Sequence, residues 1–355
     1  MSCARRCPSR VRGASLPRGN APAAVIFGCA GLALTEEEKR FFAETDPLGF
    51  ILFSRNVESP DQVRALVTSL RECVGREAPV LIDQEGGRVQ RLKLPHWPPR
   101  PAMAKFGALA DRDLMQARRA ARLNAHLIAA ELKDLGIDVD CAPLIDVPVA
   151  GADNIIGDRA FGTDPALVAD LGRAVMDGLL DGGVMPIVKH IPGHGRAMVD
   201  SHKALPVVGA ERELLEKTDF ATFRSLRDAP WGMTAHVIYS AYDDRRPATL
   251  SKKVVGEVIR GFIGFEGVLL SDDLSMHALS GSFEERARES LGAGCDVVLH
   301  CNGDMNEMTG VAQGVRPLDD AARLRLSIAE EKRRRLPLMM DAQAFIDGWL
   351  EESKA

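Results

Sequence analysis

The chain has 355 residues with 46% hydrophobic and 27% charged residues and a formal net charge of −5, a composition typical of an ordinary globular protein. The acidic balance argues against a nucleic-acid-binding protein, and no apolar run is long and apolar enough to span a membrane. Seven scattered cysteines without a CxxC pair favour reduced, buried thiols over a disulfide framework. We therefore expect a cytoplasmic protein that acts on a small molecule.

The N-terminal segment has two possible readings. Residues 1–20 carry five arginines and no acid, and an apolar run from Ala23 to Leu34 follows, as in a secretory signal. However, residues 23–30 are also the only candidate for the first strand of the repeat described next. We therefore predict a disordered basic tail over 1–20, a folded catalytic domain over 21–340, and a C-terminal helix or tail over 341–355.

Short apolar runs alternate with longer amphipathic segments eight times along the chain. The predicted strands are 23–28, 49–54, 79–83, 137–143, 185–190, 232–237, 267–272 and 296–301. Helix-capping residues such as Thr35 and Ser59 precede the intervening segments, and residues 111–135 repeat apolar positions with a helical period. Eight βα units predict a single-domain (β/α)8 barrel of the α/β class. A doubly wound open sheet is the alternative, because a count of units does not establish closure.

Ionisable side chains follow most of the predicted strands. They are Asp83, Asp146, Lys189, His190, His236, Asp272 and Asp273, and Asn302 follows the last strand. In a barrel these positions converge at the carboxyl ends of the strands, where active sites lie. Single residues such as Asp273 and Asn302 could instead cap the next helix, but helix capping does not account for the whole ring.

Two stretches place charged residues after predicted strands. In IDQEGGRVQR (82–91), Asp83 is followed by Arg88 and Arg91, and a carboxylate beside an arginine can bind vicinal hydroxyls or an acyl group. In GDRAFGTDP (157–165), Arg159 follows the fourth strand. A structural ion pair and a surface turn, respectively, are equally compatible with these patterns.

Two further stretches offer groups that could react. In KHIPGHGRAMVDSH (189–202), Asp200 and His202 are two residues apart, so the carboxylate can orient the imidazole for proton transfer. In GVLLSDDLSMHAL (267–279), Asp272 leaves an apolar strand directly, and such a rigid element suits a nucleophile.

Together these strings resemble glycoside hydrolase family 3, and within it the bacterial β-N-acetylglucosaminidases of the peptidoglycan-recycling type. The matching strings are IDQEGGRVQR, GDRAFG, KHIPGHG followed by DSH, TAHVIY and GVLLSDDLSM, in the family's order between residues 51 and 280. The chain departs mildly from the family in having Ile191 where an aromatic residue is usual, and in its basic N-terminal extension.

The resemblance implies roles for the candidate residues. Asp272 would be the nucleophile of a retaining exo-glycosidase, and His202, oriented by Asp200, would be the general acid and base. Nearby Lys189 would favour the ionised state of Asp272. The residues that would hold the hydroxyls and the N-acetyl group are Asp83, Arg91, Arg159, Lys189 and His190. The resemblance also implies a one-domain form, N-acetylglucosaminyl-anhydromuropeptides as substrates, and no cofactor, metal, nucleic-acid or membrane partner. We take a monomer as the default, and leave open whether water or phosphate is the acceptor, as in a broader family 3 glycosidase or phosphorylase.

Three other functions remain as alternatives. A metal-dependent barrel hydrolase needs three or four converging ligands, and the candidates are His190, His194, His202, His236 and Asp272. A Schiff-base aldolase would use Lys189. A non-catalytic sugar-binding protein would have no need for a nucleophile beside a proton-transfer pair.

Overall fold

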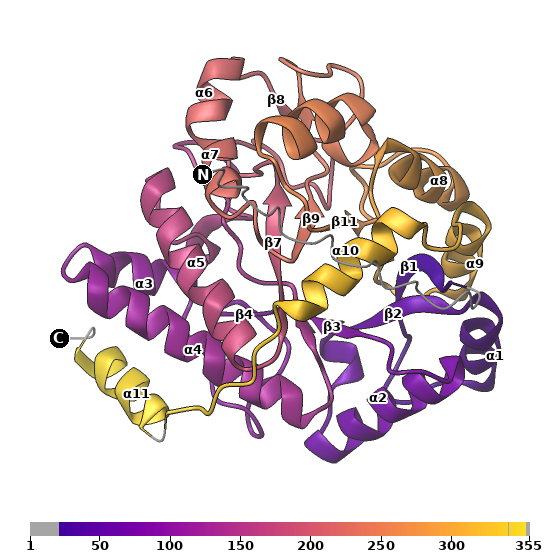
Figure 1. Ribbon diagram of the computed structural model, residues 1–355, viewed down its shortest axis with the longest axis horizontal. Helices are drawn as coiled ribbons and strands as arrows, with labels where there is room; N and C mark the ends of the chain where they lie inside the picture. Colours follow the sequence, from indigo (N-terminus) through magenta and orange to yellow (C-terminus); the bar gives the residue numbers. More distant parts are fainter. Residues whose placement is uncertain (1–20, 340, 353–355) are drawn as a thin grey trace, which may run out of the picture.

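The computed structural model describes residues 21–339 and 341–352, so the basic tail predicted over 1–20 lies outside the described residues. Eight parallel strands form a closed barrel in the spatial order β1-β12-β11-β9-β7-β6-β3-β2 (Figure 1). They are β1 (Ala23–Gly28), β2 (Pro47–Leu52), β3 (Val80–Ile82), β6 (Val139–Asp140), β7 (Met185–Ile191), β9 (Trp231–Thr234), β11 (Val268–Asp273) and β12 (Val297–His300).

The strand pairing decides between the barrel and the open sheet. β1 pairs in parallel with both β2 and β12, which closes the sheet. Each predicted strand segment overlaps one barrel strand, so the predicted (β/α)8 barrel is confirmed and the open-sheet alternative is wrong. Two short ribbons lie outside the barrel: β4 (Gln84–Gly86) with β5 (Val89–Gln90), and β8 (Val207–Val208) with β10 (Ile238–Tyr239).

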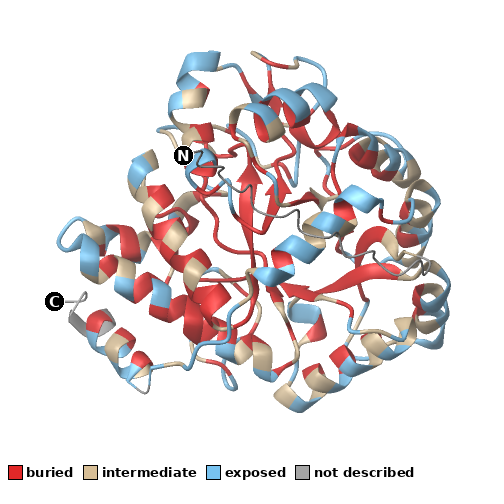
Figure 2. Cartoon of the chain, viewed as in Figure 1, coloured by how far each residue is buried: buried red, intermediate tan, exposed pale blue. Residues whose placement is uncertain are grey.

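Helices surround the barrel with their buried faces toward the strands and their exposed faces toward solvent (Figure 2). They are α1 (Glu36–Thr45), α2 (Pro60–Val74), α3 (Met103–Ala110), α4 (Leu114–Asp134), α5 (Pro165–Asp181), α6 (Arg212–Lys217), α7 (Asp219–Ser225), the π-helix η4 (Val254–Phe262), α8 (Phe283–Ala293), α9 (Met305–Gly314), α10 (Asp320–Glu331) and α11 (Ala342–Glu352). Short 3₁₀ turns are η1 (Ser54–Asn56), η2 (Gly157–Arg159) and η3 (Ala248–Leu250).

Local chemistry sets several helix ends. Thr35 and Glu38 form a reciprocal capping box at the start of α1, as the capping signal predicts. The helix predicted over 111–135 begins later, at Leu114, because the side chain of Asp113 accepts the amide of Gln116 and so caps α4.

The amino-terminal end of the barrel is covered by α10. Arg325 of this helix pairs with Asp296, just before β12, and the Lys332 ammonium donates to the carbonyl of Asp228, before β9. Beyond it, Trp349 of α11 stacks on Phe106 of α3 with ring centroids 4.9 Å apart. Active sites of such barrels lie at the opposite end, in the loops at the carboxyl ends of the strands. The division of the chain at residues 340 and 341 stays a prediction.

Candidate active site

Asp272 stands at the carboxyl end of β11 in the barrel mouth. Its Oδ1 accepts the amide of Asp273 at 2.8 Å. Burial acts to raise the pKa of Asp272, but the surrounding histidines, His190 first, outweigh burial, and the net pKa lies below the ordinary value of 3.8. The carboxylate is therefore ionised at neutral pH, as a nucleophile must be.

The loop after β7, residues 192–206, carries Asp200 and His202. Nδ1 of His202 lies 2.8 Å from Oδ1 of Asp200, and the same oxygen accepts the His202 amide at 2.9 Å. Burial acts to raise the pKa of Asp200, but these bonds from His202 lower it. The His202 side chain is 61% exposed, so its other ring nitrogen is free to meet a ligand. His202 also lowers the pKa of Asp272, so the two groups interact electrostatically.

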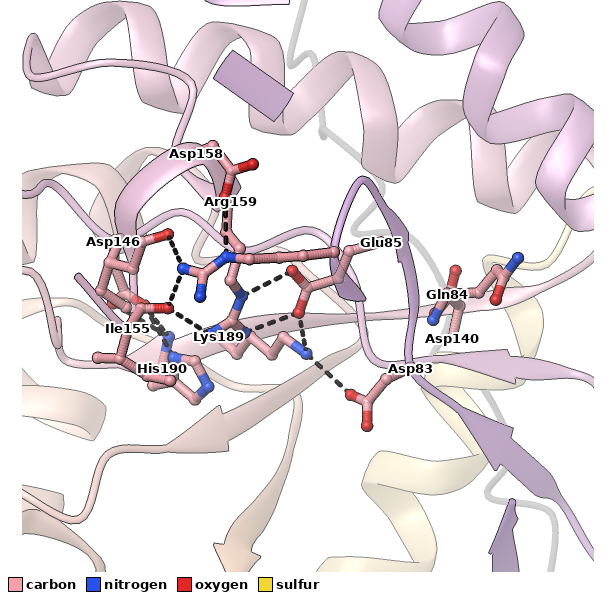
Figure 3. A network of polar contacts seen from close by, with 12 residues as sticks. Asp83, Gln84, Glu85, Asp140, Asp146, Ile155, Asp158, Arg159, Lys189 and His190 are labelled. Atoms are coloured by element: carbon pink, nitrogen blue, oxygen red, sulfur yellow. Dashed lines mark hydrogen bonds and ion pairs between the residues drawn. The ribbon is translucent and has the colours of Figure 1, made fainter. Parts of the chain in front are cut away.

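A buried ion network fills the neighbouring side of the mouth (Figure 3). The Lys189 ammonium, at the end of β7, lies 3.0 Å from Asp83 and 2.6 Å from Glu85. Arg159 donates two hydrogen bonds to Glu85, at 2.8 and 2.9 Å, and Arg91 donates to Asp83 at 3.0 Å. The network thus joins residues from the loops after β3 and β6 to β7.

The network is ionised throughout. Burial opposes the charge on both carboxyls, but the cations prevail: they lower the pKa of Glu85 to about 2, and Lys189 and Arg91 hold that of Asp83 well below its usual range. In turn, Asp83 and Glu85 outweigh burial and raise the pKa of Lys189. Fixed, paired charges of this kind are suited to orienting hydroxyl groups, because their hydrogen-bonding directions are already set.

His190 is held by a fully buried carboxylate. Asp146 accepts Nδ1 of His190 at 2.8 Å, the His190 amide at 3.2 Å and the His194 amide at 2.6 Å. Burial acts to raise the pKa of Asp146, and His190 and His194 lower it. The ring of His190 is therefore fixed through Nδ1, and Nε2 is the nitrogen left to face a ligand.

The structure brings the sequence-predicted residues together in three groups. Asp83, Arg91, Arg159 and Lys189 share the ion network, Asp200 and His202 form a pair, and Asp272 and His190 are electrostatic neighbours.

Three details differ from the sequence analysis. Arg88 does not reach Asp83; it pairs with Asp158 at 2.8 Å and binds the carbonyls of residues 154–156. Lys189 is occupied by Asp83 and Glu85, so the histidines rather than Lys189 account for the lowered pKa of Asp272. Asp273 does not cap a helix but binds the amide and hydroxyl of Ser275.

Sequence reasoning missed Glu85 as a functional candidate. Its signal was present, since it lies two residues after Asp83 in the same short motif, but no pattern specified that Lys189 and Arg159 would converge on it. Asp146 was recognised as a strand-end acid, yet its partner His190 became evident only from the fold.

The described residues contain neither a membrane-spanning helix nor a metal-binding cluster. Within residues 21–339 and 341–352, no helix has the length and hydropathy needed to cross a membrane. Over the same residues, no group of three or more His, Cys, Asp or Glu side chains is arranged to hold a metal ion.

Comparison with known proteins adds an independent line of evidence. The model of the glycosyl hydrolase family 3 N-terminal domain matches residues 24–335. A protein named beta-hexosaminidase from Alkalilimnicola ehrlichii is 43% identical over 284 residues, covering 78% of this chain and 80% of that protein. One of the same name from Bordetella avium is 40% identical over 285 residues, covering 79% and 81%.

Solved structures agree. The crystal structure of native NagZ from Neisseria gonorrhoeae superposes with a TM-score of 0.82 at 34% identity, covering 93% of this chain and 98% of that one. The same protein has been crystallised in complex with N-trifluoroacetyl-D-glucosamine; that structure has a TM-score of 0.82 at 32% identity, covering 94% and 98%.

Proposed function

The chain belongs to glycosyl hydrolase family 3, and from this premise we propose that it is a retaining exo-β-N-acetylglucosaminidase that removes terminal N-acetylglucosamine from anhydromuropeptides. Membership of this family and the similarity to proteins named beta-hexosaminidase indicate a glycoside hydrolase with β-N-acetylhexosaminidase activity. The retaining chemistry, the residues that perform it and the cell-wall substrate are our inference.

The main support for this proposal is that an ionised carboxylate lies near a group that can donate a proton. Asp272 has a lowered pKa, and His202 of the Asp200 pair is close enough to contribute to that lowering. A carboxylate that stays ionised can attack a carbon centre, and a histidine can supply a proton near neutral pH.

The proposed reaction has two steps. In the first, Asp272 attacks the anomeric carbon while His202 gives its proton to the glycosidic oxygen, so the C–O bond breaks and a glycosyl ester of Asp272 forms. In the second, neutral His202 takes a proton from water as that water attacks the anomeric carbon, which releases the sugar and restores Asp272. Two displacements at one carbon retain the β configuration. The negative charge of Asp272 also stabilises the oxocarbenium-like transition states.

We propose that the residues of the ion network and His190 bind the sugar. Asp83 and Arg91 are the most exposed members of the network, at 14% and 25%, so we expect them to bind the sugar hydroxyls directly. Lys189 and Arg159 lie deeper and are held by Glu85, so each can offer a hydrogen bond without moving. The N-acylated glucosamine bound to the Neisseria gonorrhoeae relative supports a site for such a sugar.

We propose that the protein works in the cytoplasm, as a monomer, in cell-wall recycling, and that no cofactor, metal, nucleic acid or membrane takes part. These statements follow from the family resemblance and from the acidic balance of the chain.

A product assay tests the proposal most broadly. The enzyme is incubated with N-acetylglucosaminyl-anhydromuropeptide, with and without inorganic phosphate, and the products are separated by mass spectrometry. We expect free N-acetylglucosamine in both reactions. N-acetylglucosamine 1-phosphate in the second would show that phosphate is the acceptor, and an intact substrate in both would refute the assignment to anhydromuropeptides.

A further inference from the structure

The short segment that carries the acid/base pair, residues 198–204, is hydrogen-bonded to the rest of the described protein through one residue, Ser201. Ser201 is only 2% exposed, whereas Met198 and Val199 before it are 59% and 40% exposed and the His202 side chain after it is 61% exposed. Within the part of the chain that the structure describes, both hydrogen bonds that join residues 198–204 to the rest of the molecule fall on Ser201.

The two bonds reach different parts of the mouth. The Ser201 hydroxyl lies 3.0 Å from Nε2 of His194, at the base of the same loop. The Ser201 carbonyl accepts the amide of Ala278 at 3.2 Å, in the segment that follows Asp272. Because Ser201 stands between Asp200 and His202, these bonds fix the pair relative to the nucleophile.

Among the described residues, the imidazole of His194 forms a hydrogen bond only with Ser201. His194 is 3% exposed, and among the described residues Nδ1 has no hydrogen-bond partner, so the ring's hydrogen bond is the one between Nε2 and Ser201. Burial, together with neighbouring His190, lowers the pKa of His194 to about 4, so the ring is neutral near pH 7. A neutral imidazole and a hydroxyl form an ordinary hydrogen bond, strong enough to bias a loop and weak enough to open.

We propose that the hydrogen bond between His194 and Ser201 is a latch that holds the acid/base segment, residues 198–204, in its working position. Ser201 and His194 are then positioning residues: neither touches the reacting atoms, and both act through His202. The main chain of His194 donates to Asp146, which also holds His190, so the latch shares its support with the side of the mouth assigned to the sugar. The expected effect of the latch on catalysis rests on the proposed function. Its effect on the position of residues 198–204 does not.

Limited proteolysis tests the latch without any chemistry on substrate. Lys203 lies in the segment with a side chain 82% exposed. Release of the segment should make the peptide bond after Lys203 more accessible to trypsin. Ser201→Ala removes the hydroxyl and keeps the carbonyl bond to Ala278. We expect trypsin to cut at Lys203 about fivefold faster in this variant, the effect of losing one neutral hydrogen bond.

Two further variants serve as controls. Ser240→Ala, at an exposed serine outside the segment, should be cut at the wild-type rate, and Ser201→Thr, which keeps a hydroxyl, should be cut more slowly than Ser201→Ala. Unchanged cutting of Ser201→Ala would overturn the latch whatever the protein's substrate is.

Kinetics then test the catalytic consequence. Ser201→Ala should lower kcat/KM about fivefold for an alkyl β-N-acetylglucosaminide, whose leaving group needs a proton, and leave kcat/KM for the dinitrophenyl glycoside unchanged. An equal loss on both substrates would contradict a role through His202. If the wild-type protein cleaves neither glycoside, the proposed function fails while the proteolysis comparison still decides the latch.

Discussion

Lys189 Nζ lies 2.6 Å from Oε1 of Glu85, and both side chains are at most 3% exposed. The same carboxylate receives two hydrogen bonds from Arg159. One buried acid therefore pairs with two cations that we propose to bind the sugar, and the integrity of the site depends on a residue that need not touch the substrate.

Replacing Glu85 by Gln should destabilise the protein strongly, because it leaves Lys189 and Arg159 buried with one negative charge fewer. Breaking a buried pair from one side costs about 3–5 kcal/mol. Urea denaturation at pH 7 measures the loss. As a control, Asp158→Asn breaks the half-exposed pair with Arg88 and should cost about 0–1 kcal/mol. Equal losses in the two variants would mean that the buried network is not structurally important.

Asp140 gives the stability of the protein a distinct pH dependence. Burial first, with only partial relief from the amide of Gln84, raises the pKa of Asp140 from 3.8 to about 7. A carboxyl with a raised pKa binds its proton more tightly in the folded chain. Its stabilising contribution is therefore complete below pH 3.8 and is lost as the pH rises through 7.

The stability of the wild-type protein should therefore fall relative to that of Asp140→Asn, which keeps an oxygen for the Gln84 amide, as the pH rises from 5 to 7. Buried His194, whose pKa is lowered to about 4, makes the opposite contribution in this range, but it does so in both proteins and drops out of the difference. Glu85 does not interfere, because its lowered pKa confines its own effect to the range between about 2 and 4.5. The measurement is the difference between the two urea midpoints at pH 5 and at pH 7, and a difference that does not change with pH would contradict the role of Asp140.

The barrel itself was predictable from sequence because its strands are buried on both faces and read as apolar runs. Asp272 was predictable for a related reason, because it is the first carboxylate after the apolar residues of β11. The ion network was not, because Lys189 and Glu85 are 104 positions apart and only the closed barrel brings them together. Likewise, the contact between His194 and Ser201 depends on how the 192–206 loop turns back, which no periodicity in the sequence specifies.

His202→Ala should affect substrates according to their leaving groups. Loss of a general acid lowers the rate by about 10²–10⁴ where the departing oxygen needs a proton, and far less where it does not. The measurement is kcat/KM for an alkyl and a dinitrophenyl β-N-acetylglucosaminide. His96→Ala, at an exposed histidine of another loop, should match the wild type on both. If His202→Ala lost the same factor on both substrates, His202 would not be the acid.

Removal of metal ions should leave the activity intact. The proposed steps use only Asp272, His202 and Asp200, and these groups are engaged as pairs rather than as a set of converging ligands. The test is hydrolysis of the dinitrophenyl glycoside after exhaustive dialysis against a chelator. Lost activity that returns on adding a single divalent metal would favour the metal-dependent alternative.

In the proposed mechanism Asp272 forms a covalent bond to the sugar. The direct measurement is peptide mapping by mass spectrometry after incubation with 5-fluoro-N-acetylglucosaminyl fluoride, an activated sugar whose enzyme ester hydrolyses slowly. We predict that the wild-type protein gains the mass of one glycosyl unit on the peptide that contains Asp272, and that Asp272→Asn gains none. A label on a different residue, or turnover of the reagent with no label at any time, would contradict the role of Asp272 as the nucleophile.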